Sequence, residues 1–160
     1  MSNLLQFSIS EALSLLEKKE FSTKELVETY INAIEKTKDL NMYLTTCFDQ
    51  ALEQAKISDQ NYLNGNQRFL EGIPLGIKDM FCTKDIKTTA SSKILENFIP
   101  TYESTVTQNL WNDGAVILGK LSCDEFAMGS SNETAAKGNV INPWLKNKKM
   151  SPGGSSGGSA

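Results

Sequence analysis

Two short stretches of the sequence contain lysine and serine residues suited to proton transfer. Lys78 lies in Gly72–Asp79, which reads GIPLGIKD, and Ser155 and Ser156 lie in Ser151–Ala160, which reads SPGGSSGGSA. A lysine can act as a base towards a hydroxyl nucleophile, and a serine placed between the two groups can relay the proton. The two stretches are therefore candidates for nucleophilic catalysis with lysine as the base.

The protonation state of Lys78 decides whether this chemistry is possible. A lysine acts as a base only when it is neutral, and burial away from water disfavours the ammonium. Apolar neighbours such as Ile73, Ile77 and Phe81 predict such burial. Asp79 would favour the ammonium if its carboxylate faced the amine, but adjacent residues of a strand face opposite sides. A solvated surface lysine is the alternative interpretation.

The Gly/Ser composition of residues 151–160 allows three interpretations without catalysis. The stretch could be a flexible linker or an ordered turn. A phosphate-binding loop is disfavoured because the lysine of GxxxxGK[ST] is missing. Only the combination with Gly72–Asp79 favours a catalytic role, and the sequence alone does not separate Ser155 from Ser156 as the relay.

Composition narrows the possible classes of function. The 160 residues contain no histidine, so a Ser-His-Asp arrangement cannot be built within them. The net charge of −3 argues against a general nucleic-acid-binding surface. Cys47, Cys82 and Cys123 lack metal-ligand spacing and are expected to be reduced thiols, with no metal site. No apolar run is long enough for a membrane span and no signal-like start is present, so we expect a cytoplasmic protein that does not contact the membrane.

The opening segment predicts helices, and a strand follows them. Ser8 and Glu11, and again Ser22 and Glu25, have capping-box spacing. Apolar residues at helical spacing follow each pair and predict helices over 8–19 and 22–36. We expect a strand within 42–48, a helix over 48–58 and a polar connection over 59–69 with a turn at Asn64-Gly65.

The later segment alternates strands and helices. We expect a buried strand or strand-like turn over 73–81 that carries Lys78, and loops over 83–100. A short helix is expected over 102–114, with Ser104 as its cap and Gly114 at its end. The apolar run 115–118, bounded by Gly119, predicts a second buried strand. This alternation favours an α/β fold in one domain.

GIKD and GGSSGG together resemble the motifs of the amidase signature family, whose members cleave carboxamides. The resemblance implies that Lys78 is the family lysine and that Ser155, 77 positions later, is the bridging serine after a cis peptide bond at Gly154–Ser155. It implies a fold in which N-terminal helices lead into part of a mixed sheet covered by helices. Residues 1–160 would be the N-terminal part of a single domain, truncated before the nucleophile and inactive alone.

Three further stretches are similar to the tRNA-dependent amidotransferase branch of that family: GAVILGK (114–120), DEFAMGSS (124–131) and NPW (142–144). This resemblance implies that Met128, through its carbonyl, and Ser130 bind substrate. It implies glutamine hydrolysis that supplies ammonia to convert Glu-tRNA(Gln) to Gln-tRNA(Gln). The B and C subunits of such an amidotransferase are the expected partners. The complex would use ATP and Mg²⁺, and this chain would need no cofactor.

Two alternative functions stay open from the sequence. One is a free-standing amidase that acts on another carboxamide without partner subunits. The other is a non-catalytic interaction module that ends in a flexible Gly/Ser tail, which a mobile 151–160 segment and a solvent-exposed Lys78 would favour.

Overall fold

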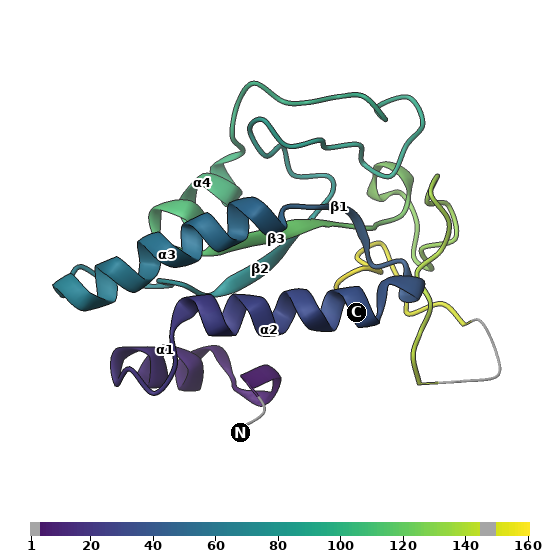
Figure 1. Cartoon of the computed structure of the whole chain (residues 1–160). Coiled ribbons are helices and arrows are strands. Elements are labelled where there is room, and N and C mark those ends of the chain that lie inside the picture. The colour runs from purple at the N-terminus through teal and green to yellow at the C-terminus, as the bar shows by residue number, and fades with distance from the viewer. Residues whose placement is uncertain (1–3, 145–149) are drawn as a thin grey trace. The chain divides into compact units, whose positions relative to one another are not determined.

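The computed structural model describes residues 4–144 and 150–160, and it is an α/β fold as predicted (Figure 1). The helices are α1 (Ile9–Glu17), α2 (Thr23–Lys36), α3 (Phe48–Asn64) and α4 (Thr105–Asn112). The strands are β1 (Tyr43–Thr46), β2 (Pro74–Lys78) and β3 (Val116–Leu121). Short 3₁₀ turns occupy Leu4–Gln6, Lys38–Leu40 and Glu125–Ala127. No helix within the described residues is both long enough and apolar enough to cross a membrane.

The chain forms two compact units, each assembled from three segments. The first draws on residues 1–36, 47–75 and 108–118, and the second on 37–46, 76–107 and 119–160. Lys78 and Ser155 both belong to the second unit. The single domain expected from the resemblance stays a prediction.

Capping boxes begin the helices α1 and α2 of the first unit. The Glu11 carboxylate accepts a hydrogen bond from the Ser8 amide at 2.8 Å, and the Ser8 hydroxyl accepts one from the Glu11 amide at 3.3 Å. Ser22 and Glu25 repeat this exchange before α2. Each box satisfies backbone N–H groups that have no partner within the helix, which explains why both helices begin where the sequence predicts.

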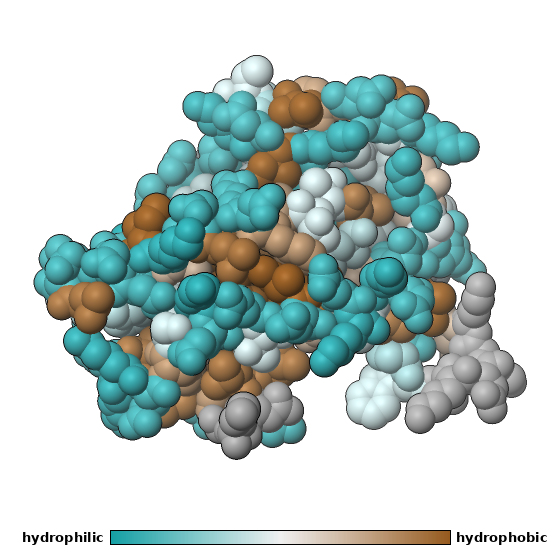
Figure 2. Space-filling model, viewed as in Figure 1, coloured by the Kyte–Doolittle hydropathy of each residue, from teal (hydrophilic) through white to brown (hydrophobic). Residues whose placement is uncertain are grey.

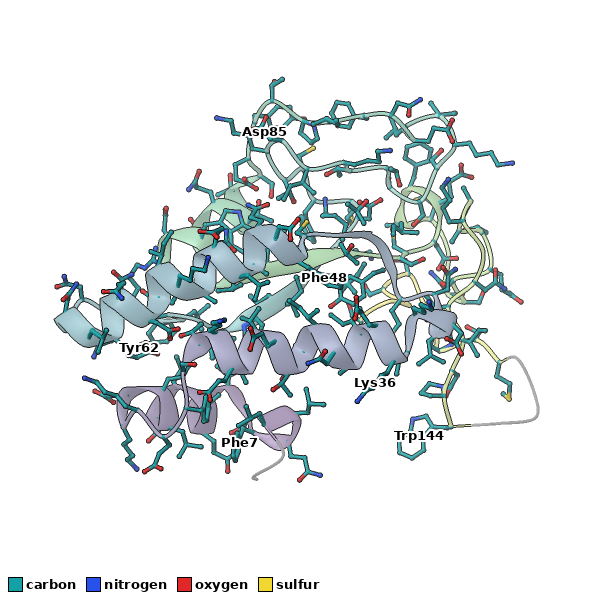
Figure 3. All side chains as sticks on the ribbon, in the orientation of Figure 1. Phe7, Lys36, Phe48, Tyr62, Asp85 and Trp144 are labelled. Carbon is teal, nitrogen blue, oxygen red and sulfur yellow. The ribbon has the colours of Figure 1, made fainter. Side chains whose placement is uncertain are left out.

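An apolar core holds the helices of the first unit together. Its buried members are Ala12, Leu16, Leu26 and Ile73, and Tyr62 packs against them. Figure 2 shows apolar residues along the line where α2 and α3 meet, with hydrophilic residues on their outer faces. In Figure 3, Tyr62 lies on the side of α3 that faces α2.

Helix α3 is longer than the sequence predicts. The expected end at Ser58 is wrong, because the helix continues to Asn64 and Gly65 caps it by donating its amide to the Asn61 carbonyl. Ala51, Ala55 and Ser58 are buried on one face, and Tyr62 continues that face. The polar residues after Ser58, which suggest a connection, form the exposed side of the same helix.

Strand β3 lies at the centre of a three-stranded sheet with the order β1-β3-β2, and all six of its residues are buried. It pairs antiparallel with β1, with Tyr43 opposite Leu121 and Thr46 opposite Gly119. The expected boundary at Gly119 is wrong, since β3 runs through it. A Cβ at Gly119 would lie 2.3 Å from the Thr45 carbonyl oxygen, so the glycine lets the two backbones approach within the sheet.

A buried carboxylate fixes the segment that leads into β2. The Glu71 side chain has no exposed surface and accepts hydrogen bonds from Arg68 Nε at 2.7 Å and from Ser58 Oγ at 2.6 Å. Burial raises the pKa of Glu71, but the hydrogen bonds from Arg68 and Ser58 outweigh it and hold the pKa below its ordinary value. The ionised form of Glu71 therefore stabilises the first unit.

We expect Glu71→Gln to lower the free energy of unfolding of the complete protein by roughly 1–3 kcal/mol at pH 7, because charge-assisted hydrogen bonds are lost inside the unit. The folded-state pKa is depressed, so this contribution is present above the ordinary value of 4.5 and is lost as the pH falls through the lowered pKa. Urea unfolding between pH 7 and pH 3.5 measures the difference. Glu53→Gln, which alters an exposed pair with Lys56, is the control and should change little. A loss for Glu71→Gln that is constant with pH would contradict the prediction.

Candidate active site

The structure brings Lys78 and Ser155 into direct contact. Lys78 is the last residue of β2, and its Nζ lies 2.6 Å from Ser155 Oγ, 77 positions along the chain. Lys78 as a whole residue is half-buried. A contact of this length allows a proton to pass between the amine and the hydroxyl.

Backbone contacts hold Ser155 beside the end of β3. The Gly154–Ser155 peptide bond is cis, as the resemblance implies. The Ser155 carbonyl accepts a hydrogen bond from the Asp124 amide at 3.0 Å, and the Gly158 amide donates to the Ser122 carbonyl at 2.9 Å. Residues 155–158 therefore follow the chain that leaves β3, and this path points the Ser155 hydroxyl at Lys78.

Ser156 occupies a different position from Ser155. Its carbonyl accepts hydrogen bonds from the amides of Ser159 and Ala160, which closes a turn. The Lys78 amine donates to the hydroxyl of Ser155. Of the two candidate serines, Ser155 is therefore the one whose hydroxyl contacts Lys78, a point that the sequence leaves open.

Asp124 is a buried residue that the sequence analysis does not single out. Its carboxylate accepts hydrogen bonds from the Asn132 amide at 2.9 Å and from Thr134 Oγ1 at 3.0 Å. A Cβ at Gly154 would lie 2.2 Å from Asp124 Oδ2. Asp124 thus braces the Gly154–Ser155 segment from two sides, by its amide and by its carboxylate. The only signal in the sequence is its place at the start of DEFAMGSS.

The two predicted substrate-binding residues lie on the loop that follows Asp124. Met128 is 83% exposed, and Ser130 is exposed as well. The main chain of Ser130 passes next to Gly154, since a Cβ at Gly154 would lie 2.7 Å from the Ser130 carbonyl carbon. The loop therefore runs beside the Lys78–Ser155 pair, and substrate binding by Met128 and Ser130 stays a prediction.

Asp79 directs its carboxylate to partners other than Lys78. Its Oδ2 accepts hydrogen bonds from the Thr89 amide at 2.9 Å and from Thr89 Oγ1 at 2.5 Å. Its Oδ1 lies 3.6 Å from Nζ of Lys120, and both side chains of this ion pair are fully buried. The sequence predicts that Asp79 could face away from Lys78, but it gives no sign of Lys120 as a partner.

A buried thiol lies in the same region of the second unit. Burial raises the pKa of Cys123, and a hydrogen bond with Ser91 opposes that effect. The charges of Asp79 and Lys78 also act on this thiol, with opposite signs. Within the described residues, no cluster of three His, Cys, Asp or Glu side chains could hold a metal ion.

Part of the Gly/Ser stretch is packed in the structure. Gly157 and Gly158 are buried, and a Cβ at Gly158 would lie 2.6 Å from the Met42 carbonyl oxygen. Together with the half-buried Lys78, this packing disfavours the interpretation of residues 151–160 as a solvated tail.

A lysine hydrogen-bonded to a serine in a Gly/Ser loop is an arrangement that can transfer protons to and from a nucleophile, as histidine does in a Ser-His-Asp site. The family model for Amidase matches residues 25–160, and the chain belongs to this family. The resemblance noted from GIKD and GGSSGG is thereby confirmed.

Curated relatives match the whole chain. The A subunit of glutamyl-tRNA(Gln) amidotransferase from Caulobacter sp. (strain K31) is 56% identical over 163 residues, which cover 100% of this chain and 33% of the relative. The protein of the same name from Rickettsia bellii (strain OSU 85-389) is 55% identical with the same coverage. The chain thus spans about a third of the length of the curated relatives it matches.

Solved structures share the fold. Peptide amidase from Stenotrophomonas maltophilia has a TM-score of 0.87 and 27% identity, covering 96% of this chain and 33% of that chain. The A subunit of glutamyl-tRNA(Gln) amidotransferase from Thermotoga maritima has a TM-score of 0.77 and 29% identity, covering 99% of this chain and 32% of that chain. These similarities confirm the predicted amidase signature fold.

Proposed function

We propose that this chain carries the lysine and the bridging serine of a glutamine amidase subunit. That subunit releases ammonia, which converts misacylated Glu-tRNA(Gln) to Gln-tRNA(Gln). The observation that carries the proposal is the 2.6 Å contact between Lys78 Nζ and Ser155 Oγ. The identity of 56% to the A subunit of a glutamyl-tRNA(Gln) amidotransferase supports the choice of substrate.

In the proposed mechanism, the nucleophilic serine, which the family resemblance places after residue 160 of the same protein, attacks the side-chain amide of glutamine. Its hydroxyl proton passes to Ser155 Oγ while the Ser155 proton passes to neutral Lys78, so Ser155 ends the step with one proton, as it began. The proton then returns along the same path to the departing nitrogen, which leaves as ammonia. Water hydrolyses the acyl-enzyme to glutamate and restores the nucleophilic serine.

The partners and cofactors of the reaction belong to the same proposal. The B and C subunits complete a heterotrimer, in which the B subunit uses ATP and Mg²⁺ to activate Glu-tRNA(Gln). The net charge of −3 supports a division in which another subunit contacts the tRNA. The complex would work in the cytoplasm, which the three free cysteines of this chain support.

A free-standing amidase is the second candidate function. The TM-score of 0.87 to a peptide amidase, against 0.77 to the Thermotoga maritima amidotransferase protein, favours it. Its substrate would be another carboxamide, and its activity would not depend on partner subunits. The same Lys78–Ser155 contact would serve both reactions.

The two candidates differ in substrate and in partner dependence. We expect the complete protein that carries this chain to hydrolyse glutamine, and to form Gln-tRNA(Gln) only with the B and C subunits, ATP and Mg²⁺. Ammonia release from glutamine and from a C-terminal peptide amide should be compared with and without these partners. Hydrolysis of the peptide amide alone, at a rate that the partners do not change, would contradict the proposal and support the second candidate.

A further inference from the structure

We propose that Lys120 keeps Lys78 able to act as a base, because it serves as the counter-ion of Asp79. This inference rests on the proposed function, in which neutral Lys78 accepts the relayed proton. It makes Lys120 and Asp79 positioning residues, because both act through the charge that surrounds Lys78.

The ion pair lies wholly inside the second unit. The side chains of Asp79 and Lys120 have no exposed surface, and Lys120 Nζ lies 3.6 Å from Asp79 Oδ1. Lys120 also donates hydrogen bonds to the Phe81 carbonyl at 2.9 Å and to Thr88 Oγ1 at 2.6 Å. These bonds fix the ammonium beside the carboxylate, although Asp79 Oδ1 itself lacks a hydrogen-bond partner.

The ion pair matters because the charges of Asp79 and Lys78 both act on Cys123, so the two groups lie in one region of the second unit. A buried carboxylate is costly unless a cation compensates it. Lys120 supplies that cation from β3, while Lys78 directs its amine to Ser155. Without Lys120, the Asp79 carboxylate would have no cation beside it, and its charge would favour the ammonium form of Lys78.

Other ionisable groups around Lys78 do not take over this role. Cys123 interacts electrostatically with Lys78, but burial keeps its thiol neutral by raising its pKa. Asp124, whose amide binds Ser155, directs its carboxylate to the Asn132 amide and to Thr134. Ser91, which bonds to Cys123, carries no charge.

The test is the pH dependence of kcat/KM for glutamine, measured with the complete protein and its partner subunits. In the profile of kcat/KM against pH, the acid limb is the range in which activity rises with pH. Lys120→Met should shift this limb to higher pH by about one unit, which is the lower end of the pKa change that a nearby opposite charge causes. The sign follows because an uncompensated carboxylate favours the ammonium of Lys78, so a higher pH is needed to form the neutral base. Lys120→Met combined with Asp79→Asn removes both charges and should return the limb towards that of the unchanged protein.

Lys87→Met is the matched control, because Lys87 is an exposed lysine of the same unit and its loss changes the net charge equally. It should leave the acid limb in place. Thermal unfolding of each variant identifies any loss of fold. If the ion pair between Lys120 and Asp79 had a purely structural role, Lys120→Met would lower activity at every pH. The acid limb would then not shift, and the double variant would not move it back.

Acylation of Lys78 by an amine-reactive reagent gives a second readout that does not need the substrate. Only the neutral amine reacts, so mass spectrometry of Lys78 labelling against pH should show the same upward shift in Lys120→Met. Unchanged labelling and an unchanged acid limb would overturn the inference while leaving the proposed function intact. Full glutamine hydrolysis by the Lys78→Met variant would instead remove Lys78 from the mechanism. Failure of the inference about Lys120 can therefore be distinguished from failure of the proposed function.

Discussion

Ser155→Ala should lower kcat/KM for amide hydrolysis in the complete protein by roughly 10²–10⁴-fold, the usual contribution of a positioned proton-transfer group. The hydroxyl is the atom that contacts Lys78 Nζ at 2.6 Å, so its removal interrupts the path from nucleophile to base. Lys78→Met should cause a loss of the same order, since methionine has a side chain of similar length but cannot accept a proton. Steady-state kinetics with glutamine measure both variants.

Neighbouring substitutions provide the controls for this prediction. Ser156→Ala should retain most of the activity, because the contact of Ser156 with the rest of the loop is made by its main chain. Combining Ser155→Ala with Lys78→Met should cost little more than either change alone, since the two residues act as one relay. A variant with Ser155→Ala that keeps full turnover would remove Ser155 from the mechanism and return the Gly/Ser stretch to a structural role.

Gly154→Ala should abolish most of the activity without touching either reacting group. The added Cβ would lie 2.2 Å from Asp124 Oδ2 and 2.7 Å from the Ser130 carbonyl carbon. Because one of these neighbours is backbone and the other is a buried, hydrogen-bonded carboxylate, the loop that carries Ser155 must move. A displacement of about 1 Å at such a site can cost roughly 100-fold in rate, and overpacking of this kind costs about 1–3 kcal/mol of stability.

Gly153→Ala distinguishes the effect of steric crowding by an added Cβ from the effect of an unfavourable backbone angle. A Cβ at Gly153 meets no atom within 4 Å, although its φ of +103° is unfavourable for alanine. This variant should lose some stability and retain far more activity than Gly154→Ala. Kinetics and thermal unfolding of the two variants measure the two effects separately. Equal losses of activity in both variants would show that the close packing around Gly154 does not determine the position of Ser155.

Local features of the fold could be predicted from the sequence because their signals are local. Ser8 with Glu11 and Ser22 with Glu25 lie three residues apart, so the spacing alone predicts the helix starts that the structure shows. The end of α3 could not be placed in this way, because the polar residues after Ser58 look the same in a loop and on an exposed helix face.

Contacts across the chain could not be derived from spacing. Lys78 and Ser155 are 77 positions apart, and only the resemblance to a family suggests that they meet. Lys120 is hidden for a physical reason: a lysine at the end of an apolar run is typical of a surface residue, whereas here β3 carries it inside to Asp79. The bracing role of Asp124 is equally invisible, since its main-chain bond to Ser155 depends on the fold.

The packing of the glycines changes how the stretch SPGGSSGGSA should be understood. By composition it is low-complexity sequence, the kind in which one small residue can usually replace another. In the structure, Gly154, Gly157 and Gly158 each lie too close to neighbouring atoms to carry a methyl group, while Gly153 has space but an unfavourable backbone angle. The four positions therefore favour glycine for two different reasons. A library that varied these four glycines should therefore return few functional sequences, although the composition of the segment suggests the opposite.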